Sequence, residues 1–188
     1  MSSTSAPFGL RPAYHPSGVT RPTAMSILTG YSSNILQNQP VKIVPSSTGE
    51  GTIAAAAIGD RFIGTFQGVE WTDSDGRRRV SNKWTASTAG TDIIAYVTVD
   101  PTIIYEIQTN ATVAVTDIGK QCDFTTIGTG STVTGLSAMM LDVASATTNA
   151  SLRIMGITPG PDNNWGDTYV IVQVQISEHQ NVADVAAY

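Results

Sequence analysis

Short segments in which apolar and polar residues alternate run through most of the chain, and this period of two predicts β-strands. The pattern is clearest in residues 169–176, where apolar residues occupy every even position from Val170 to Ile176. Gly, Pro and Asn separate the segments, and amphipathic helical patterns are rare. We therefore expect an all-β fold, either an antiparallel β-barrel or a two-sheet sandwich, of which the jelly roll is one form.

The expected strands are distributed along the whole body of the chain. One segment, 53–58, fits either a strand or a helical turn, because alanine favours the helix. Residues 117–120 predict a single helical turn capped by Asp117. Pro101 lacks a backbone N–H, so it predicts a bend where one long strand changes sheets or turns a corner. The predicted strands are residues 39–44, 61–71, 92–99, 103–108, 112–116, 139–143, 152–157 and 169–176.

A β-hairpin is predicted between Phe66 and Trp84. Asp75-Gly76 favours a two-residue turn, and this register places Trp71 opposite Val80. Directly opposed residues share a face of the sheet, so one face of the hairpin is apolar and the other is polar or charged. The face expected to be buried carries Val69, Trp71, Val80 and Trp84.

Residues 1–24 differ in character from the rest. They contain four of the nine prolines, which disfavour both helix and central strand and leave an extended chain. Phe8, Leu10 and Tyr14 are apolar anchors that we expect to lie against a surface. The sequence therefore predicts an extended N-terminal arm over residues 1–24 and a single β-domain over residues 25–188.

The charge of the chain limits its partners. Charged residues make up 13% of the chain, about half the usual share, and the net charge is −5. The N-terminal arm, residues 1–24, is called the leader below, and it holds Arg11 and Arg21 and no acid. The remaining residues therefore carry 8 basic and 15 acidic side chains, a net charge of −7. An acidic body does not favour nucleic acid as a partner. We also expect no membrane partner, because the apolar runs are too short to span a bilayer, and no secretion signal.

Candidate chemistry is sparse. Cys122 is the single cysteine, so a disulfide within the chain and a thiolate metal cage are excluded. The two histidines, His15 and His179, lack partners at metal-ligand spacing, and there is no Gly-x-Ser-x-Gly motif. Asp73-Ser74-Asp75-Gly76 resembles the start of a calcium loop, but Trp84 stands where the loop needs glutamate. We therefore expect no metal, no cofactor and no nucleophilic catalytic residue.

Two sugar-related interpretations stay open. A carboxylate pair for glycoside hydrolysis can come from acids far apart in the sequence, although no pair is indicated here. A carbohydrate-binding β-domain would need exposed aromatic side chains, and the candidates are Trp71, Trp84 and Trp165.

Several short motifs follow one another along most of the chain. They are Ala6 to Pro12 with His15 and Gly18, Asp100 to Gln108, Asp117 to Lys120, Gly130 to Ser137 running into Leu141-Asp142, Leu152 to Ile154 with Pro161 to Asn163, and His179. Taken in order and spacing, these motifs resemble a family of tailed-bacteriophage virion structural proteins, described as capsid decoration, cement or head-stabilising proteins. Relatives tend to show two aspartates before the proline, where this chain has Val99-Asp100.

The resemblance implies a structural protein without enzymatic activity. Such a protein binds the outer surface of the phage capsid, stabilises contacts between subunits of the major capsid protein and forms a homo-oligomer, a trimer or a dimer. It would be made in the cytoplasm of the bacterial host and reside in the virion. The alternative is another virion position: a head fibre, a tail part or a host-attachment component. The candidate capsid contacts are Phe8, Leu10, Arg11, Tyr14 and Arg21.

Overall fold

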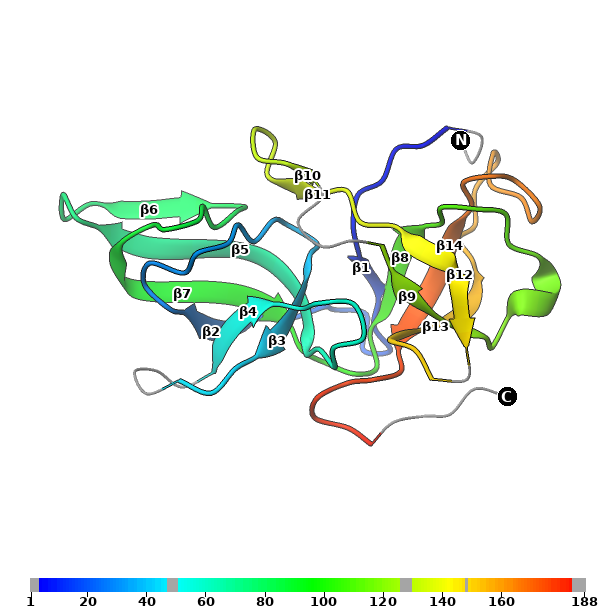
Figure 1. Ribbon diagram of the computed structural model, residues 1–188, viewed down its shortest axis with the longest axis horizontal. Coiled ribbons are helices and arrows are strands. Elements are labelled where there is room, and N and C mark those ends of the chain that lie inside the picture. The colour runs from blue at the N-terminus through cyan, green and yellow to red at the C-terminus, as the bar shows by residue number, and fades with distance from the viewer. Residues whose placement is uncertain (1–3, 47–50, 126–129, 148, 184–188) are drawn as a thin grey trace.

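The protein folds into β-strands throughout, which confirms the predicted all-β class (Figure 1). The computed structural model describes residues 4–46, 51–125, 130–147 and 149–183. Within these ranges one 3₁₀ turn, η1 (Val115–Asp117), accompanies the strands. The strands are β1 (Arg11–Tyr14), β2 (Thr23–Ile27), β3 (Pro40–Ile43), β4 (Thr52–Ala55), β5 (Gly64–Asp73), β6 (Arg78–Ser81), β7 (Gly90–Thr98), β8 (Ile104–Gln108), β9 (Gln121–Phe124), β10 (Gly130–Ser131), β11 (Leu136–Ser137), β12 (Leu141–Thr147), β13 (Leu152–Ile157) and β14 (Ile171–Ile176).

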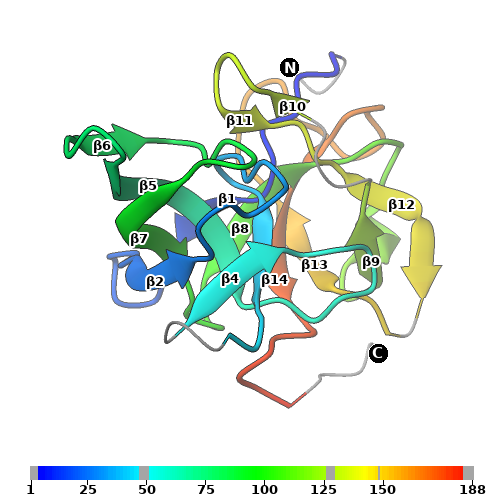
Figure 2. The same cartoon turned by 60° about the vertical axis from the view of Figure 1, so that its left-hand side comes forward.

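Five strands form a closed barrel. Their order is β3-β4-β2-β7-β5, and a further pairing between β3 and β5 completes the ring. The pairing of β2 with β4 is parallel, the other pairings are antiparallel, and β6 extends β5 outside the ring. Figure 2 shows these strands wrapped around their own core. The buried residues of that core are Ile27, Ile35, Val41, Ile53, Ile63, Phe66, Val69, Trp84, Ala95 and Val97.

A second, six-stranded sheet has the order β1-β8-β14-β13-β9-β12, and all its pairings are antiparallel. A bridge between Thr109 and Leu141 brings the start of β12 beside the end of β8, so this sheet curls around a second core. Alternate residues of β14 point into that core, as the period of two predicted. Its largest contributors include Leu10, Phe62, Tyr105, Phe124, Leu141, Leu152 and Ile154.

The closed barrel is inserted between two neighbouring strands of the second sheet. Strands β2 to β7 follow one another in sequence and all belong to the barrel or its extension, whereas β1 and β8 pair with each other in the second sheet. The chain therefore leaves the second sheet after Tyr14, builds the barrel, and returns to the neighbouring strand at Ile104. The two bodies lie side by side in Figure 1.

Pro101 lies at the predicted corner. It falls between β7, which belongs to the barrel, and β8, which belongs to the second sheet, so the chain changes sheets at this proline. The bend predicted from its missing N–H is confirmed. We refer to residues 99–103 as the crossover.

The β5–β6 hairpin forms, but its predicted register is wrong by one residue. Trp71 pairs with Arg79 rather than Val80, and Glu70 pairs with Val80. The turn holds three residues between the hydrogen-bonded pair Asp73 and Arg77, because Gly76 adopts a positive φ of 78° that accommodates the additional residue. Val80 therefore points outward and is 77% exposed, while Val69 and Trp84 are buried as expected.

The leader is part of both bodies rather than an arm that stands away from them. It contributes β1 to the second sheet and β2 to the closed barrel, so the expected boundary after residue 24 falls inside β2. Its prolines are compatible with this placement, because Pro12 lies on an edge strand and Pro16 and Pro22 lie in the connection. Residues 1–3 and 184–188 of the expected ranges lie outside the described residues.

Two further expectations, and one strand that was not expected, lie between residues 52 and 124. Of the segment 53–58, residues 53–55 belong to strand β4, and residues 56–58 form neither strand nor helix. Residues 112–116 do not form a strand, because η1 begins at Val115, and Asp117 ends this turn with its carboxylate accepting the N–H of Ala114 at 2.8 Å. Strand β9 was not predicted, although its sequence Gln-Cys-Asp-Phe alternates, because four residues are too short for the pattern to stand out.

Candidate functional site

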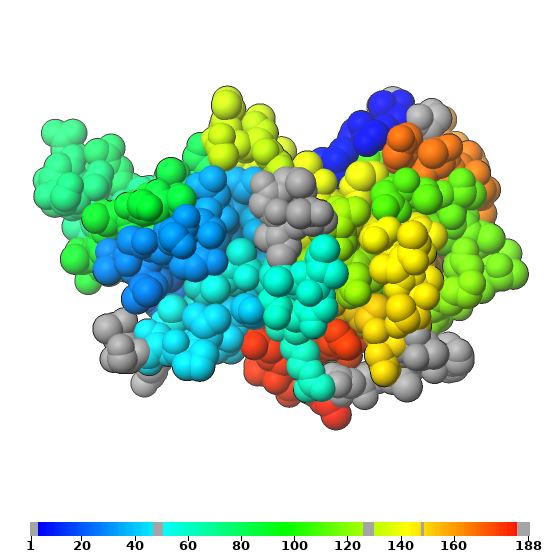
Figure 3. Space-filling model, viewed as in Figure 1, coloured from blue at the N-terminus to red at the C-terminus, as the bar shows by residue number. Residues whose placement is uncertain are grey.

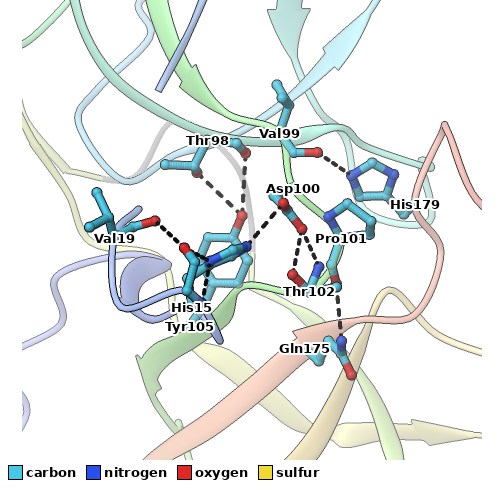
Figure 4. A network of polar contacts seen from close by, with 11 residues as sticks. His15, Val19, Thr98, Val99, Asp100, Pro101, Thr102, Tyr105, Gln175 and His179 are labelled. Atoms are coloured by element: carbon cyan, nitrogen blue, oxygen red, sulfur yellow. Dashed lines mark hydrogen bonds and ion pairs between the residues drawn. The ribbon is translucent and has the colours of Figure 1, made fainter. Parts of the chain in front are cut away.

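The crossover between the two bodies carries a network of polar contacts that includes several residues of the predicted motifs (Figure 4). His15, in the connection after β1, places Nε2 3.0 Å from Oδ2 of Asp100. The other carboxylate oxygen of Asp100 accepts the N–H of Thr102 at 2.8 Å and its hydroxyl at 2.6 Å. These bonds from Thr102, with a smaller contribution from His15, hold the pKa of Asp100 below its ordinary value.

The side chains of Ser17, His15 and Asp100 follow one another as in a hydrolytic triad. Ser17 Oγ lies 2.6 Å from His15 Nδ1, and the group borders a hollow of about 280 Å³ that Arg21 also lines. However, the backbone N–H of Ser17 donates to the same Nδ1 at 3.1 Å, which occupies the lone pair that would have to accept the hydroxyl proton. The turn from His15 to Gly18 therefore orients the His15 ring against Asp100.

His179 contacts the crossover at the preceding residue. Its Nε2 donates to the carbonyl oxygen of Val99 at 3.1 Å, and its Nδ1 accepts the N–H of Asn181 at 3.1 Å. The residue is only 2% exposed. Burial lowers the pKa of His179, against the opposing effects of the backbone of Val99 and Ile63 and of the Asp100 charge. The two histidines of the chain thus bind adjacent residues of one crossover.

A buried phenol joins the same network. Tyr105 on β8 lies with its hydroxyl 3.3 Å from both the side-chain and the carbonyl oxygen of Thr98, the last residue of β7. Thr98 in turn lies 2.8 Å from the hydroxyl of Thr65 on β5. Burial raises the pKa of Tyr105, so the phenol stays protonated and able to donate. This group ties the barrel to the second sheet and offers no ionised nucleophile.

The predicted capsid contacts do not share one surface. Leu10 is fully buried in the second core, and its N–H donates to the carbonyl of Asn38 at 2.8 Å. Arg11 covers the Phe8 ring, with its guanidinium carbon 4.5 Å from the ring centre, and bonds Glu106 at 2.7 Å. Tyr14 is 53% exposed, and Arg21 is exposed beside the hollow near His15.

The three tryptophans do not line a common exposed cleft. Trp84 is fully buried in the barrel core, and Trp71 is partly buried against it with ring centres 5.7 Å apart. Trp165 is partly buried against the other core. This arrangement removes the main feature that a carbohydrate-binding interpretation required.

Sequence reasoning identified Pro101 and both histidines separately but did not bring them together. The available signal was that the only two histidines fall inside the motifs that carry the resemblance, next to an Asp-Pro corner. Their proximity depends on the pairing of β1 with β8 and on the path of the C-terminal segment, neither of which has a local sequence signature.

Within the described ranges, no group of three His, Cys, Asp or Glu residues could hold a metal ion. The same residues include no helix of sufficient length and apolar character to cross a membrane. Comparison of the chain with protein-family models, curated proteins and solved structures gave no match. The proposals below therefore depend on the motifs, the fold and the geometry of the crossover.

Proposed function

We propose that this chain is a structural protein of a tailed-phage virion that binds the outer surface of the capsid and stabilises contacts between major capsid protein subunits. The observation that supports this proposal is where the resemblance motifs lie. The stretch from Ala6 to Pro12 and the stretch from Asp100 to Gln108 pair as neighbouring strands, with Arg11 opposite Glu106. His15 and His179 then bind Asp100 and Val99, at the start of the second stretch.

These motif residues make contacts within the chain. Arg11 bonds Glu106, His15 bonds Asp100 and His179 bonds Val99. A protein that does chemistry would direct several such groups toward a substrate space. Motif residues that instead join two β-bodies fit a protein whose task is to keep its shape while it supports a lattice.

The docked leader gives the proposed capsid contact a fixed shape. Ala6 donates its N–H to Gln108 at 2.8 Å, and Asn38 donates to the carbonyl of Phe8 at 3.1 Å, so residues 6–14 are held against the body. A contact that is already ordered loses less conformational entropy on binding. We propose Tyr14 and Arg21, which are exposed, as the main capsid-facing members of the predicted set, and the contacting pair Phe8 and Arg11 as further members.

In this proposal Leu10 supports capsid binding indirectly and does not contact the capsid. Because its side chain is 0% exposed, its contribution to capsid binding is to hold β1 in place. The low share of charged residues also reduces the cost of removing water from a large contact.

We further propose that the protein acts as a homo-oligomer, a trimer or a dimer. Two exposed valines support this: Val133, at the tip of the β10–β11 hairpin, is 91% exposed, and Val80 on β6 is 77% exposed. The space-filling view shows the β10–β11 hairpin standing above the surface between the barrel and the second sheet (Figure 3). Exposed apolar side chains on protruding hairpins are suited to contact a second copy.

Binding to heads tests the proposal. Purified phage heads that lack this protein are mixed with the full chain and sedimented, and the bound copies per head are counted. A lattice-binding protein saturates in proportion to the capsomers, whereas a head fibre, tail or attachment component binds at a few special positions or not at all. The Tyr14→Ala/Arg21→Ala variant should lower the affinity, while Val115→Ala, at an exposed site on η1, should not. Absence of binding to the head surface would contradict the proposal.

A further inference from the structure

We propose that the crossover is an acid-sensitive clamp in which lowering the pH releases the C-terminal strap while the leader stays fastened. The C-terminal strap is defined here as residues 177–182. The inference concerns the two histidine contacts at Val99 and Asp100 and does not depend on the proposed capsid function.

The strap joins the second sheet to the barrel. It leaves β14 at Ser177, whose N–H donates to the carbonyl of Ser151 at 3.0 Å. It then bridges Phe62, which donates its N–H to Glu178 at 3.3 Å and accepts that of Gln180 at 3.1 Å. The amide of Gln180 exchanges two bonds with the backbone of Ile43 on β3, at 2.7 and 3.1 Å. His179 occupies the middle of this segment.

Both ring nitrogens of His179 are used in the neutral form. Nε2 donates to Val99, and Nδ1 accepts from Asn181 within the strap. A second proton on the ring would have to sit on Nδ1, where it would meet the N–H of Asn181. Protonation therefore costs this hydrogen bond and also places a charge at a site that is 2% exposed.

The charged groups around His179 are few. Asp100 is the negative charge that favours protonation, and it is already engaged by Thr102 and His15. Arg153 of β13 lines the hollow of about 230 Å³ that His179 also lines. Two further charged residues are sequence neighbours of the bridged pair Phe62 and His179. The positively charged Arg61 precedes Phe62, and the negatively charged Glu178 precedes His179.

The leader contact depends on Asp100 staying ionised. His15 Nδ1 accepts the N–H of Ser17, so Nε2 donates to the carboxylate of Asp100 at 3.0 Å. The two bonds from Thr102 keep Asp100 ionised when the solution becomes mildly acidic. A mildly acidic solution therefore weakens the strap side of the crossover and leaves the carboxylate on the leader side in place.

The pH ranges follow from the directions of the two pKa shifts. The pKa of His179 is lowered in the folded protein, so the unfolded chain binds more protons and the stability due to His179 falls as the pH drops below about 6.5. The pKa of Asp100 is also lowered, so its contribution is kept until the pH drops below about 3.9. Between these values the strap is weakened and the His15–Asp100 contact persists.

Hydrogen exchange of the full chain tests the clamp. Protection is measured at pH 7.5 and pH 5 after correction for the intrinsic exchange rates, in peptides that cover residues 177–182 and 99–108. The expected result is a loss of protection in the strap at pH 5 with little change at the start of β8. His179→Gln keeps a side-chain amide that can donate to Val99 but cannot titrate, so its strap should be equally protected at both pH values. His15→Gln is the matched control and should retain the pH dependence of the strap.

Equal protection of the wild-type strap at both pH values would overturn the proposal, as would a pH-dependent loss that persists in His179→Gln. If the strap amides of His179→Gln exchange rapidly at both pH values, an NMR titration of the wild type decides whether the strap responds to His179. Strap amide signals that move together with the His179 ring support the clamp, and signals that do not move with it overturn the clamp.

Discussion

Phe62 meets Phe124 edge to face, with ring centres 5.8 Å apart and an angle of 82° between the ring planes. Phe62 lies two residues before β5 of the closed barrel, and Phe124 ends β9 of the second sheet. Both side chains are fully buried. The contact therefore places an aromatic residue from the barrel segment inside the core of the second sheet.

Replacement of Phe62 should weaken the whole fold. We expect Phe62→Ala to lower the free energy of unfolding by about 3–5 kcal/mol, because it removes a buried ring and leaves a cavity. Chemical denaturation followed by tryptophan fluorescence measures the loss. Val80→Ala is the control and should change stability by less than about 0.5 kcal/mol, since Val80 is exposed. An equal effect of both variants would contradict the assignment of Phe62 to the core.

Gly64 is the position where barrel closure leaves no room for a side chain. It pairs with Val41 where β5 meets β3, and a Cβ atom on it would collide with the carbonyl oxygen of Thr98. Its φ of 156° is also one that other residues rarely adopt. We expect Gly64→Ala to destabilise the protein by at least about 3 kcal/mol, measured by the midpoint of thermal unfolding.

Gly156 provides the matched control for this substitution. It lies in β13, and a Cβ atom there would meet nothing within 4 Å. Gly156→Ala should leave the midpoint of unfolding nearly unchanged. If Gly64→Ala were as stable as Gly156→Ala, the close approach of β5 to Thr98 of β7 would be wrong.

Substitutions at Leu10 and Tyr14 distinguish the contribution of the leader to stability from its proposed contribution to capsid binding. Leu10→Ala should cost about 2–5 kcal/mol of stability, because its side chain is buried in the second core. Tyr14→Ala should change stability by less than about 0.5 kcal/mol, because the ring is half exposed, and should act on head binding alone. Denaturation and head sedimentation on the same samples measure both effects. A marginal stability loss for Leu10→Ala would show that β1 is not needed by the body.

Cys122 should be unreactive in the folded protein. Burial raises the pKa of its thiol to about 11, so the thiolate fraction at pH 8 is small. We expect alkylation by iodoacetamide at pH 8 to be on the order of a hundredfold slower in the native protein than in urea. Mass spectrometry of timed samples measures the rates. Rapid labelling under native conditions would contradict the buried placement of β9.

The strands with strong alternation could be predicted from the sequence. Residues 152–157 form β13 with the predicted bounds, and β14 follows the expected alternation. The corner at Pro101 was predictable because a missing N–H is a local property of the residue. These features depend on residues close together in the chain.

The elements that were missed depend on distant partners. Strand β1 forms although it contains Pro12, because β8 offers an edge and Leu10 enters a core made by residues far along the chain. The predicted register of the β5–β6 hairpin was wrong for a different reason. The Asp75-Gly76 pair fits both a two-residue turn and a three-residue turn, and the outward position of Val80 is settled only by the packing of the barrel.

The candidate site was predictable only in part. Exposure separates Tyr14 and Arg21 from Leu10, and the leader sequence alone does not show that Leu10 enters a core built by residues far along the chain. The proximity of His15, Asp100 and His179 could be predicted only from the path of the chain through both bodies. Contacts between residues separated by about 80 positions leave no periodic signal in a single sequence.

Because the barrel is inserted between paired strands, its two ends lie side by side. Tyr14 pairs with Ile104 on the second sheet, and Thr23 pairs with Val97 on the barrel, so the entry and exit of the insertion each begin from adjacent backbone positions. The inserted segment also supplies Phe62 to the core of the second sheet. A shortened chain in which a tight turn joins β1 to β8 would therefore lose part of that core together with the barrel.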